Sequence, residues 1–192
     1  SALDLAVDAY ACVLLSAPAG SGKTTTLAQW SRSTTMSVAW LQLAEDTNHA
    51  ATFTTYLCAA LESHLPVNAL NVLQSHDNHL NGLATHLPEM LESTRSPFVL
   101  VLDDYHVIDN NLIHTFIHRL IDNLPPHTRL VLSTRIDPPL PLAVMRAKRT
   151  LAEFRLDALR FSNSEAAALL AQWTSHTLND AEVQCLNDKV EG

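Results

Sequence analysis

Residues 16–26 read SAPAGSGKTTT and place two glycines, Gly20 and Gly22, close before the lysine Lys23. Glycine is rare in this chain, which has 192 residues and only 4 glycines. Without a Cβ, glycine lets the backbone curl tightly, and N–H groups in such a curl converge on phosphate oxygens at a helix N-terminus. The stretch therefore predicts a phosphate site in which Lys23 reaches the β- and γ-phosphates and the Thr24 hydroxyl binds Mg²⁺.

The loop departs from the strict pattern G-x-x-x-x-G-K-[ST] at its first position, where this chain has Ala17. Alanine is acceptable there if its φ stays negative, and a chance occurrence of G-x-G-K-T is the alternative interpretation. We call Ala17–Thr24 the phosphate loop. The predicted nucleotide-binding residues are Ala17, Pro18, Ala19, Gly20, Ser21, Gly22, Lys23, Thr24 and Thr25.

An acidic pair, Asp103 and Asp104, follows directly on the apolar run Phe98–Leu102. Ligands of open α/β sheets bind at the carboxyl ends of strands, and Mg²⁺ takes oxygen ligands and keeps several waters. We expect Asp103 to bind Mg²⁺ through water and Asp104 to orient or deprotonate an attacking water. A solvated Asp-Asp turn is the alternative.

A third polar group ends the stretch RLVLSTR, whose last residue is Arg135. An arginine at the carboxyl edge of a sheet can contact a γ-phosphate and stabilise the charge of phosphoryl transfer. A plain surface arginine is the alternative. The predicted catalytic residues are Lys23, Asp104 and Arg135.

Short apolar runs alternate with segments of helical period. The strands are expected at Ala11–Leu15, Val38–Leu43, Phe98–Leu102 and Leu130–Leu132, with Leu151–Leu156 as a fifth candidate. Helices are expected from the phosphate loop through Trp30 and over Thr47–Leu65, Asn81–Thr94 and Asn110–Ile121. Near-continuous apolar strands are typical of a parallel sheet that is covered on both faces. The alternation predicts an α/β fold.

The pattern changes after residue 156. Ser162 and Glu165 have the spacing of a capping box before a helix over Ala166–Trp173, and a last helix is expected over Asn179–Val190. We therefore divide the chain into a core, residues 1–156, and the start of a helical subdomain, residues 157–192.

Composition narrows the possible partners. The formal net charge is −8, which disfavours nucleic-acid binding by this segment, and no apolar run is long enough to cross a membrane. The dispersed cysteines Cys12, Cys58 and Cys185 are expected to be reduced core thiols of a cytoplasmic protein. His114 and His118 have a spacing that could hold zinc, but we expect them to be solvated.

Five segments carry a family resemblance: LLSAPAGSGKTTTLAQW, VAWLQLAEDTN, FVLVLDDYHVI, LPPHTRLVLSTRIDPPLPLAVMRA and LRFSNSEAAALL. Together they resemble the nucleotide-binding module of MalT-like regulators of the LuxR family, which are signal-transduction ATPases of the STAND class. The resemblance covers nearly the whole chain in the right order. SAPAG-x-GKT looks like this family's own form of the loop.

The resemblance implies a P-loop NTPase fold with sheet order 5-1-4-3-2, so that the Arg135 strand separates the Asp103 strand from the phosphate-loop strand. It also implies ATP or ADP with Mg²⁺ as cofactors, slow hydrolysis, and a conformational switch within a transcriptional activator. Self-association in the ATP-bound state is implied for the full-length protein, with DNA binding by another segment. The phosphate loop, Asp103, Asp104 and Arg135 carry over as site residues.

Parts of the family pattern are missing, notably an Arg-Pro segment before the first strand and a Trp-Pro turn near the end. We therefore expect weaker nucleotide binding than in a longer chain. Two other functions stay open on this fold: a conventional ATPase or kinase, and an interaction module without nucleotide. Fast turnover with a small acceptor would favour the first, and nucleotide binding unaffected by Lys23→Ala would favour the second.

Overall fold

The computed structural model describes residues 1–65, 80–94 and 96–159. Its sheet has five strands in the order β2-β3-β4-β1-β5, and each neighbouring pair is parallel. The strands are β1 Cys12–Ser16, β2 Ser37–Gln42, β3 Phe98–Asp103, β4 Thr128–Thr134 and β5 Leu151–Phe154. From the opposite edge this is the order 5-1-4-3-2, so the predicted fold class and strand order are confirmed.

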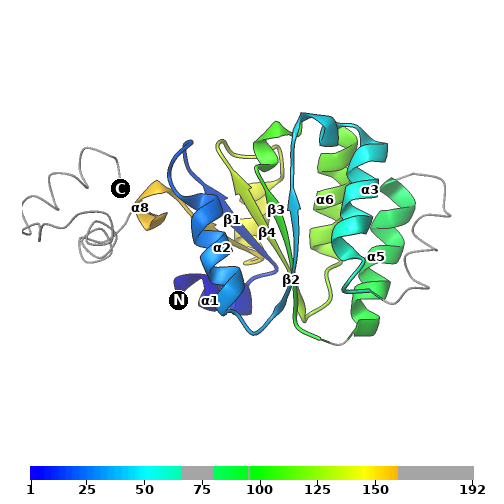
Figure 1. Cartoon of the computed structure of the whole chain (residues 1–192), viewed down its shortest axis with the longest axis horizontal. Helices are drawn as coiled ribbons and strands as arrows, with labels where there is room; N and C mark the ends of the chain where they lie inside the picture. The colour runs from blue at the N-terminus through cyan, green and yellow to red at the C-terminus, as the bar shows by residue number, and fades with distance from the viewer. Residues whose placement is uncertain (66–79, 95, 160–192) are drawn as a thin grey trace, which may run out of the picture.

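Two layers of helices enclose the sheet, as Figure 1 shows. α1 (Ala2–Ala9) and α2 (Lys23–Ser33) cover one face, and α3 (Ala50–Leu61), α5 (Leu80–Thr94), α6 (Asn111–Asp122) and α7 (Leu142–Ala147) cover the other. The short helix α8 (Leu156–Leu159) follows β5. None of the helices in the described part of the chain is long and apolar enough to cross a bilayer.

The central strands are buried on both faces, which explains their near-continuous apolar sequence. In β1, Cys12 and Leu14 pack into the core under α3, α5 and α6, whereas Val13 and Leu15 pack into the core under α1 and α2. All five residues of β1 and all six of β3 are buried. Successive side chains of a strand point to opposite faces, so a sheet with helices on both sides needs apolar residues at every position.

One predicted helix differs from the structure at its ends, and two observed helices were not predicted. The helix expected from Thr47 begins only at Ala50, after a 3-10 turn over Glu45–Asn48. The Thr47 hydroxyl donates to the Ala44 carbonyl at 2.5 Å and accepts from the Ala44 N–H at 2.9 Å. Such a local bond offers the backbone an alternative to the helical ladder. α1 and α7 are not in the sequence prediction, because with 8 and 6 residues each is too short to show a helical period.

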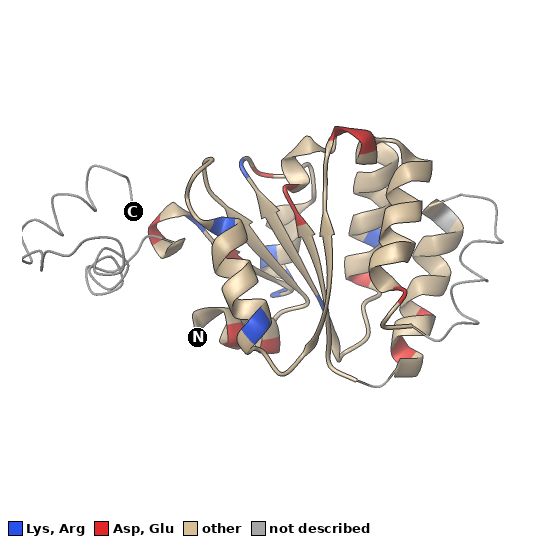
Figure 2. Cartoon of the chain, viewed as in Figure 1, with Lys and Arg blue, Asp and Glu red and all other residues tan. Residues whose placement is uncertain are grey.

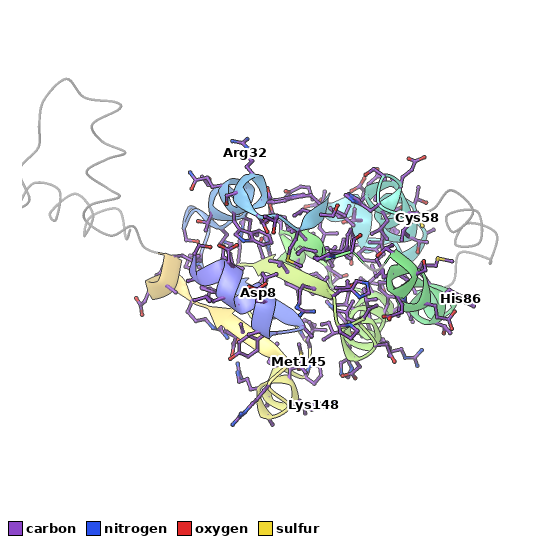
Figure 3. All side chains as sticks on the ribbon, turned by 90° about the horizontal axis from the view of Figure 1, so that it is seen from below. Asp8, Arg32, Cys58, His86, Met145 and Lys148 are labelled. Carbon is purple, nitrogen blue, oxygen red and sulfur yellow. The ribbon has the colours of Figure 1, made fainter. Side chains whose placement is uncertain are left out.

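Two of the three cysteines lie in the described part of the chain, and both are buried free thiols, as predicted. Burial raises the pKa of the Cys12 thiol to about 12, so it stays protonated at neutral pH. Cys58 is buried in α3, labelled in Figure 3. Cys185 and the helices predicted after residue 160 lie outside the described residues.

α6 differs from the prediction at two positions. Leu112 was expected in the apolar stripe but is 64% exposed in the first helical turn, which Asn110 caps. His114 was expected to be solvated but is buried, with its Nδ1 2.8 Å from the Tyr105 hydroxyl. His118 is partly exposed, and its Nε2 lies 3.3 Å from Oδ2 of Asp122. Within the described ranges, no three metal-binding side chains cluster, so the zinc alternative gains no support.

The buried His114 makes folding sensitive to acid. Burial lowers the pKa of its imidazole, and the nearby Asp109 carboxylate opposes this shift. The unfolded chain therefore takes up a proton near pH 6.5 that the folded chain resists, so stability is lost as the pH falls below that value. The unfolding midpoint should fall between pH 7 and pH 5 in both proteins. In His114→Gln this fall is expected to be about 2–4 °C smaller than in the wild type.

His118→Gln is the matched control, because this histidine lies on the same helix but is only partly buried. It should retain the wild-type pH dependence. Equal acid sensitivity in His114→Gln and the wild type would contradict a buried neutral imidazole.

Candidate functional site

The phosphate loop connects β1 to α2 and depends on two left-handed glycines. Gly20 has φ +83° and Gly22, the N-cap of α2, has φ +76°. A lack of room for a side chain is not the reason for glycine, because a Cβ added to Gly20 would lie more than 4 Å from any described atom outside its chain neighbours. The requirement is the positive φ, which strains any residue with a Cβ. The loop then leads into α2 with its free N–H groups at the helix N-terminus.

Lys23 folds back across this loop. Its Nζ donates to the carbonyls of Ala17 and Pro18 at 2.7 and 2.8 Å and to the Ser21 hydroxyl at 3.3 Å. The side chain is buried, and no carboxylate in the described structure forms an ion pair with it. Burial lowers the pKa of Lys23, although the nearby Asp104 carboxylate opposes the shift. A buried cation with only neutral acceptors favours a nearby anion.

A cavity of about 290 Å³ opens above the loop. It is lined by Ala19, Gly20, Gly22, Lys23, Thr24, Thr25, Asp104 and Arg135. The structure therefore brings the three predicted catalytic side chains to one space. Of the other predicted residues, Ala17 is buried below the loop, and Pro18 and Ser21 are not part of the lining. This volume is at the low end for ligand pockets and suits a phosphate chain better than a whole nucleotide.

Asp103 lies fully buried at the end of β3. Its Oδ1 accepts from the Ser133 hydroxyl and from the Asp104 N–H, the latter at 3.1 Å. Its Oδ2 is buried and has no hydrogen-bond partner among the residues that the structure describes. A buried carboxylate oxygen without a partner is rare, and a cation or a water held by a cation would satisfy it. The donor set therefore fits a hard divalent ion, with the exposed Thr24 hydroxyl as a further oxygen.

Asp104 is held in an unusual backbone conformation with φ 59°. Its N–H donates to the Ser133 hydroxyl at 3.0 Å, and its Oδ2 accepts from Gln42 Nε2 at 2.7 Å. On the other side, its Oδ1 lies 3.7 Å from Nδ1 of His106. A non-glycine residue in the left-handed region costs free energy, and such strain is common where a side chain must be aimed.

Three of these neighbours are not among the site residues predicted from the sequence: Gln42, His106 and Ser133. The signal for two of them is positional, since Gln42 ends β2 opposite Asp103 and Ser133 lies near the end of β4. Both are polar residues at the carboxyl ends of strands, the same rule that found Asp103. Burial lowers the pKa of His106, and the nearby Arg135 guanidinium lowers it further.

Arg135 is exposed and directly follows β4. It forms no ion pair within the described ranges, so the cavity has two cationic side chains, Lys23 and Arg135, without direct carboxylate partners. Figure 2 shows basic and acidic segments close together at the edge of the sheet where the strand arrows end. Such an edge suits a polyanion that is accompanied by a cation.

Comparisons with known proteins agree with this geometry. The AAA ATPase domain family matches residues 1–133. The HTH-type transcriptional regulator MalT of Yersinia pestis (strain Pestoides F) is 32% identical over 188 residues, which covers 95% of this chain and 21% of that protein. MalT of Yersinia enterocolitica is also 32% identical over 188 residues. The chain thus spans about a fifth of the length of these relatives.

Two solved structures share the fold. A STAND protein with a tetratricopeptide repeat sensor from Pyrococcus horikoshii has a TM-score of 0.64 at 16% identity, covering 97% of this chain and 26% of that chain. The Walker-type ATPase of Pyrococcus abyssi has a TM-score of 0.60 at 12% identity, and the match covers 97% of this chain and 60% of that chain. The expected resemblance to MalT-like regulators is confirmed, and the fold is one that generally binds a nucleotide with a divalent metal. The chain belongs to the AAA ATPase domain family.

Proposed function

We propose that the chain is the ATP- and ADP-binding switch domain of a signal-responsive transcriptional regulator, with slow Mg²⁺-dependent hydrolysis. The observation that carries this proposal is the shared cavity at a glycine-rich helix N-terminus. It is lined by a buried lysine, a carboxylate and an arginine that forms no ion pair with any described residue. The phosphates bind the amides of the phosphate loop and Lys23.

The metal in this proposal is Mg²⁺, which the Thr24 hydroxyl and, through water, Oδ2 of Asp103 would hold. The metal would supply positive charge that offsets the charge of the phosphate oxygens. Asp104 lines the cavity with its carboxylate already oriented by Gln42, and so it positions or deprotonates the attacking water. Arg135 contacts the γ-phosphate from the carboxyl end of β4.

Switching follows from the difference between the two nucleotides. A ligand shifts a conformational equilibrium only through contacts that differ between the states. The γ-phosphate supplies such a contact with Arg135 in the triphosphate complex and not in the diphosphate complex. In the full-length protein, the triphosphate state would self-associate, and the transcriptional activity named for the relatives would belong to segments outside this chain.

The test is calorimetric titration of the full chain with ATP and ADP, with Mg²⁺ or with EDTA, followed by measurement of phosphate release. We expect both nucleotides to bind, ATP to bind more tightly with Mg²⁺, and turnover to stay well below the ~1 s⁻¹ that marks a working enzyme. Fast turnover with a small acceptor would replace the switch by a conventional ATPase or kinase. Absence of nucleotide binding would leave an interaction module.

A further inference from the structure

The turn that carries Arg135 is tied to the start of the phosphate loop by two hydrogen bonds and is closed by a third within the turn itself. The Ala17 N–H donates to the Thr134 carbonyl at 3.2 Å, and the Thr134 hydroxyl donates to the Ile136 carbonyl at 2.6 Å. The Ser16 hydroxyl then donates to Oδ1 of Asp137 at 3.1 Å. Arg135 therefore lies between Thr134 and Asp137, both of which are fixed to the end of β1.

Asp137 has a second partner from another part of the chain. Arg155, directly after β5, donates from both terminal nitrogens to the two oxygens of Asp137, with Nη2 to Oδ2 at 3.2 Å. These Arg155 bonds are the main reason that the pKa of Asp137 is lowered. Arg155 also donates to Glu153, which accepts two bonds from Arg146 at 2.5 and 2.9 Å. Asp137 thus joins the ends of β1, β4 and β5.

Because the side chains of this network are partly exposed to solvent, its ion pairs contribute little to the stability of the fold. The side chains of Asp137 and Arg155 are 49% and 43% exposed, and an isolated pair of that kind contributes little to stability. Two-pronged arginine–carboxylate contacts, however, fix direction as well as distance. Within the described part of the chain, Asp137 is also the only side chain of residues 135–137 that hydrogen-bonds to other elements, so its geometry decides where this turn lies.

We propose that Asp137 is a positioning residue that holds Arg135 toward the cavity and thereby sets the preference for nucleoside triphosphate over diphosphate. The inference rests on the proposed function, because it uses Arg135 as the γ-phosphate contact. Without the Asp137 anchor the turn shifts, and the γ-phosphate contact weakens. Lys23 and the loop amides still hold the remaining phosphates, so diphosphate binding is retained.

The experiment measures dissociation constants for ATP and ADP with Mg²⁺ on the full chain. Asp137→Asn keeps an acceptor for Ser16 but removes the ion pair, and Arg155→Gln removes the partner. Each is expected to reduce the ratio of ADP to ATP dissociation constants by about fivefold, toward the value for Arg135→Ala, with ADP binding within about twofold of wild type. Arg146→Gln is the control, because it removes an arginine of the same network that does not contact Asp137.

A double-mutant cycle separates positioning from general stabilisation. In an Arg135→Ala background, Asp137→Asn should cause no further change in the ratio. If Asp137→Asn still changed the ratio fivefold in the Arg135→Ala background, the inference would be overturned. It would also be overturned if Arg135→Ala lowered the ratio and Asp137→Asn did not. Equal weakening of both nucleotides with a lower unfolding midpoint would also overturn it. A wild type that binds no nucleotide would instead refute the proposed function.

Discussion

Lys23→Ala is expected to weaken ATP binding by about thirtyfold or more, which corresponds to ~2 kcal/mol. Lys23 Nζ is the buried cation of the phosphate loop, and a charge-assisted contact to phosphate in a desolvated site is stronger than one in water. The measurement is calorimetric titration with ATP and Mg²⁺. ADP binding should weaken as well, because Lys23 reaches the β-phosphate.

Lys148→Ala is the matched control. Lys148, labelled in Figure 3, has a side chain that is 54% exposed and pairs with Asp122 at 3.3 Å, far from the cavity lining. The same loss of charge at that position should leave nucleotide affinity unchanged. If Lys148→Ala weakened binding as much as Lys23→Ala, overall charge rather than the loop would be responsible.

Loss of binding must be separated from damage to the loop, because Lys23 also bonds the carbonyls of Ala17 and Pro18. Lys23→Met keeps much of the side-chain length without the charge. It should lose ATP binding to the same degree while retaining the unfolding midpoint, since a desolvated cation contributes little net stability. Wild-type affinity in both variants would contradict the proposed role of Lys23.

The sheet could be predicted because the signals that determine it are local. Phe98–Asp103 is apolar at each position up to its final carboxylate, and only a strand covered on both faces needs that pattern. The phosphate loop is equally local, since Gly20 and Gly22 mark positions where the backbone must have a positive φ. Strand order came from the family resemblance, because pairing between distant segments leaves no mark in periodicity.

The partners of the acidic pair could not be predicted in the same way. Gln42 and Ser133 contact Asp104 only because β2, β3 and β4 lie side by side in a particular register, across 62 and 29 positions of sequence. His114 shows the same limit on a helix. Its polar type suggested that it is exposed to solvent, but its Nδ1 forms a hydrogen bond with the Tyr105 hydroxyl in the core, and that contact depends on tertiary packing.

Replacing the two adjacent carboxylates one at a time should affect different steps, ATP binding with Mg²⁺ for Asp103 and hydrolysis for Asp104. Mg²⁺ is expected to strengthen ATP binding in the wild type, and Asp103→Asn is expected to reduce that gain in affinity about tenfold. The reason is that a neutral amide replaces the carboxylate proposed to face the metal. Binding in EDTA should stay close to wild type. The measurement is the ratio of ATP dissociation constants in EDTA and in Mg²⁺.

Asp104→Asn is expected to leave that ratio unchanged and to slow phosphate release by about a hundredfold, the low end of what a positioned acid or base contributes. The amide oxygen can still accept from Gln42, so the geometry at the end of β3 is retained while the charge is lost. Asp109→Asn replaces an exposed carboxylate on the same connection and should change neither quantity. If the two replacements gave identical defects in binding and hydrolysis, the acids would act as one metal site. The separation suggested by a buried Asp103 and a cavity-lining Asp104 would then be wrong.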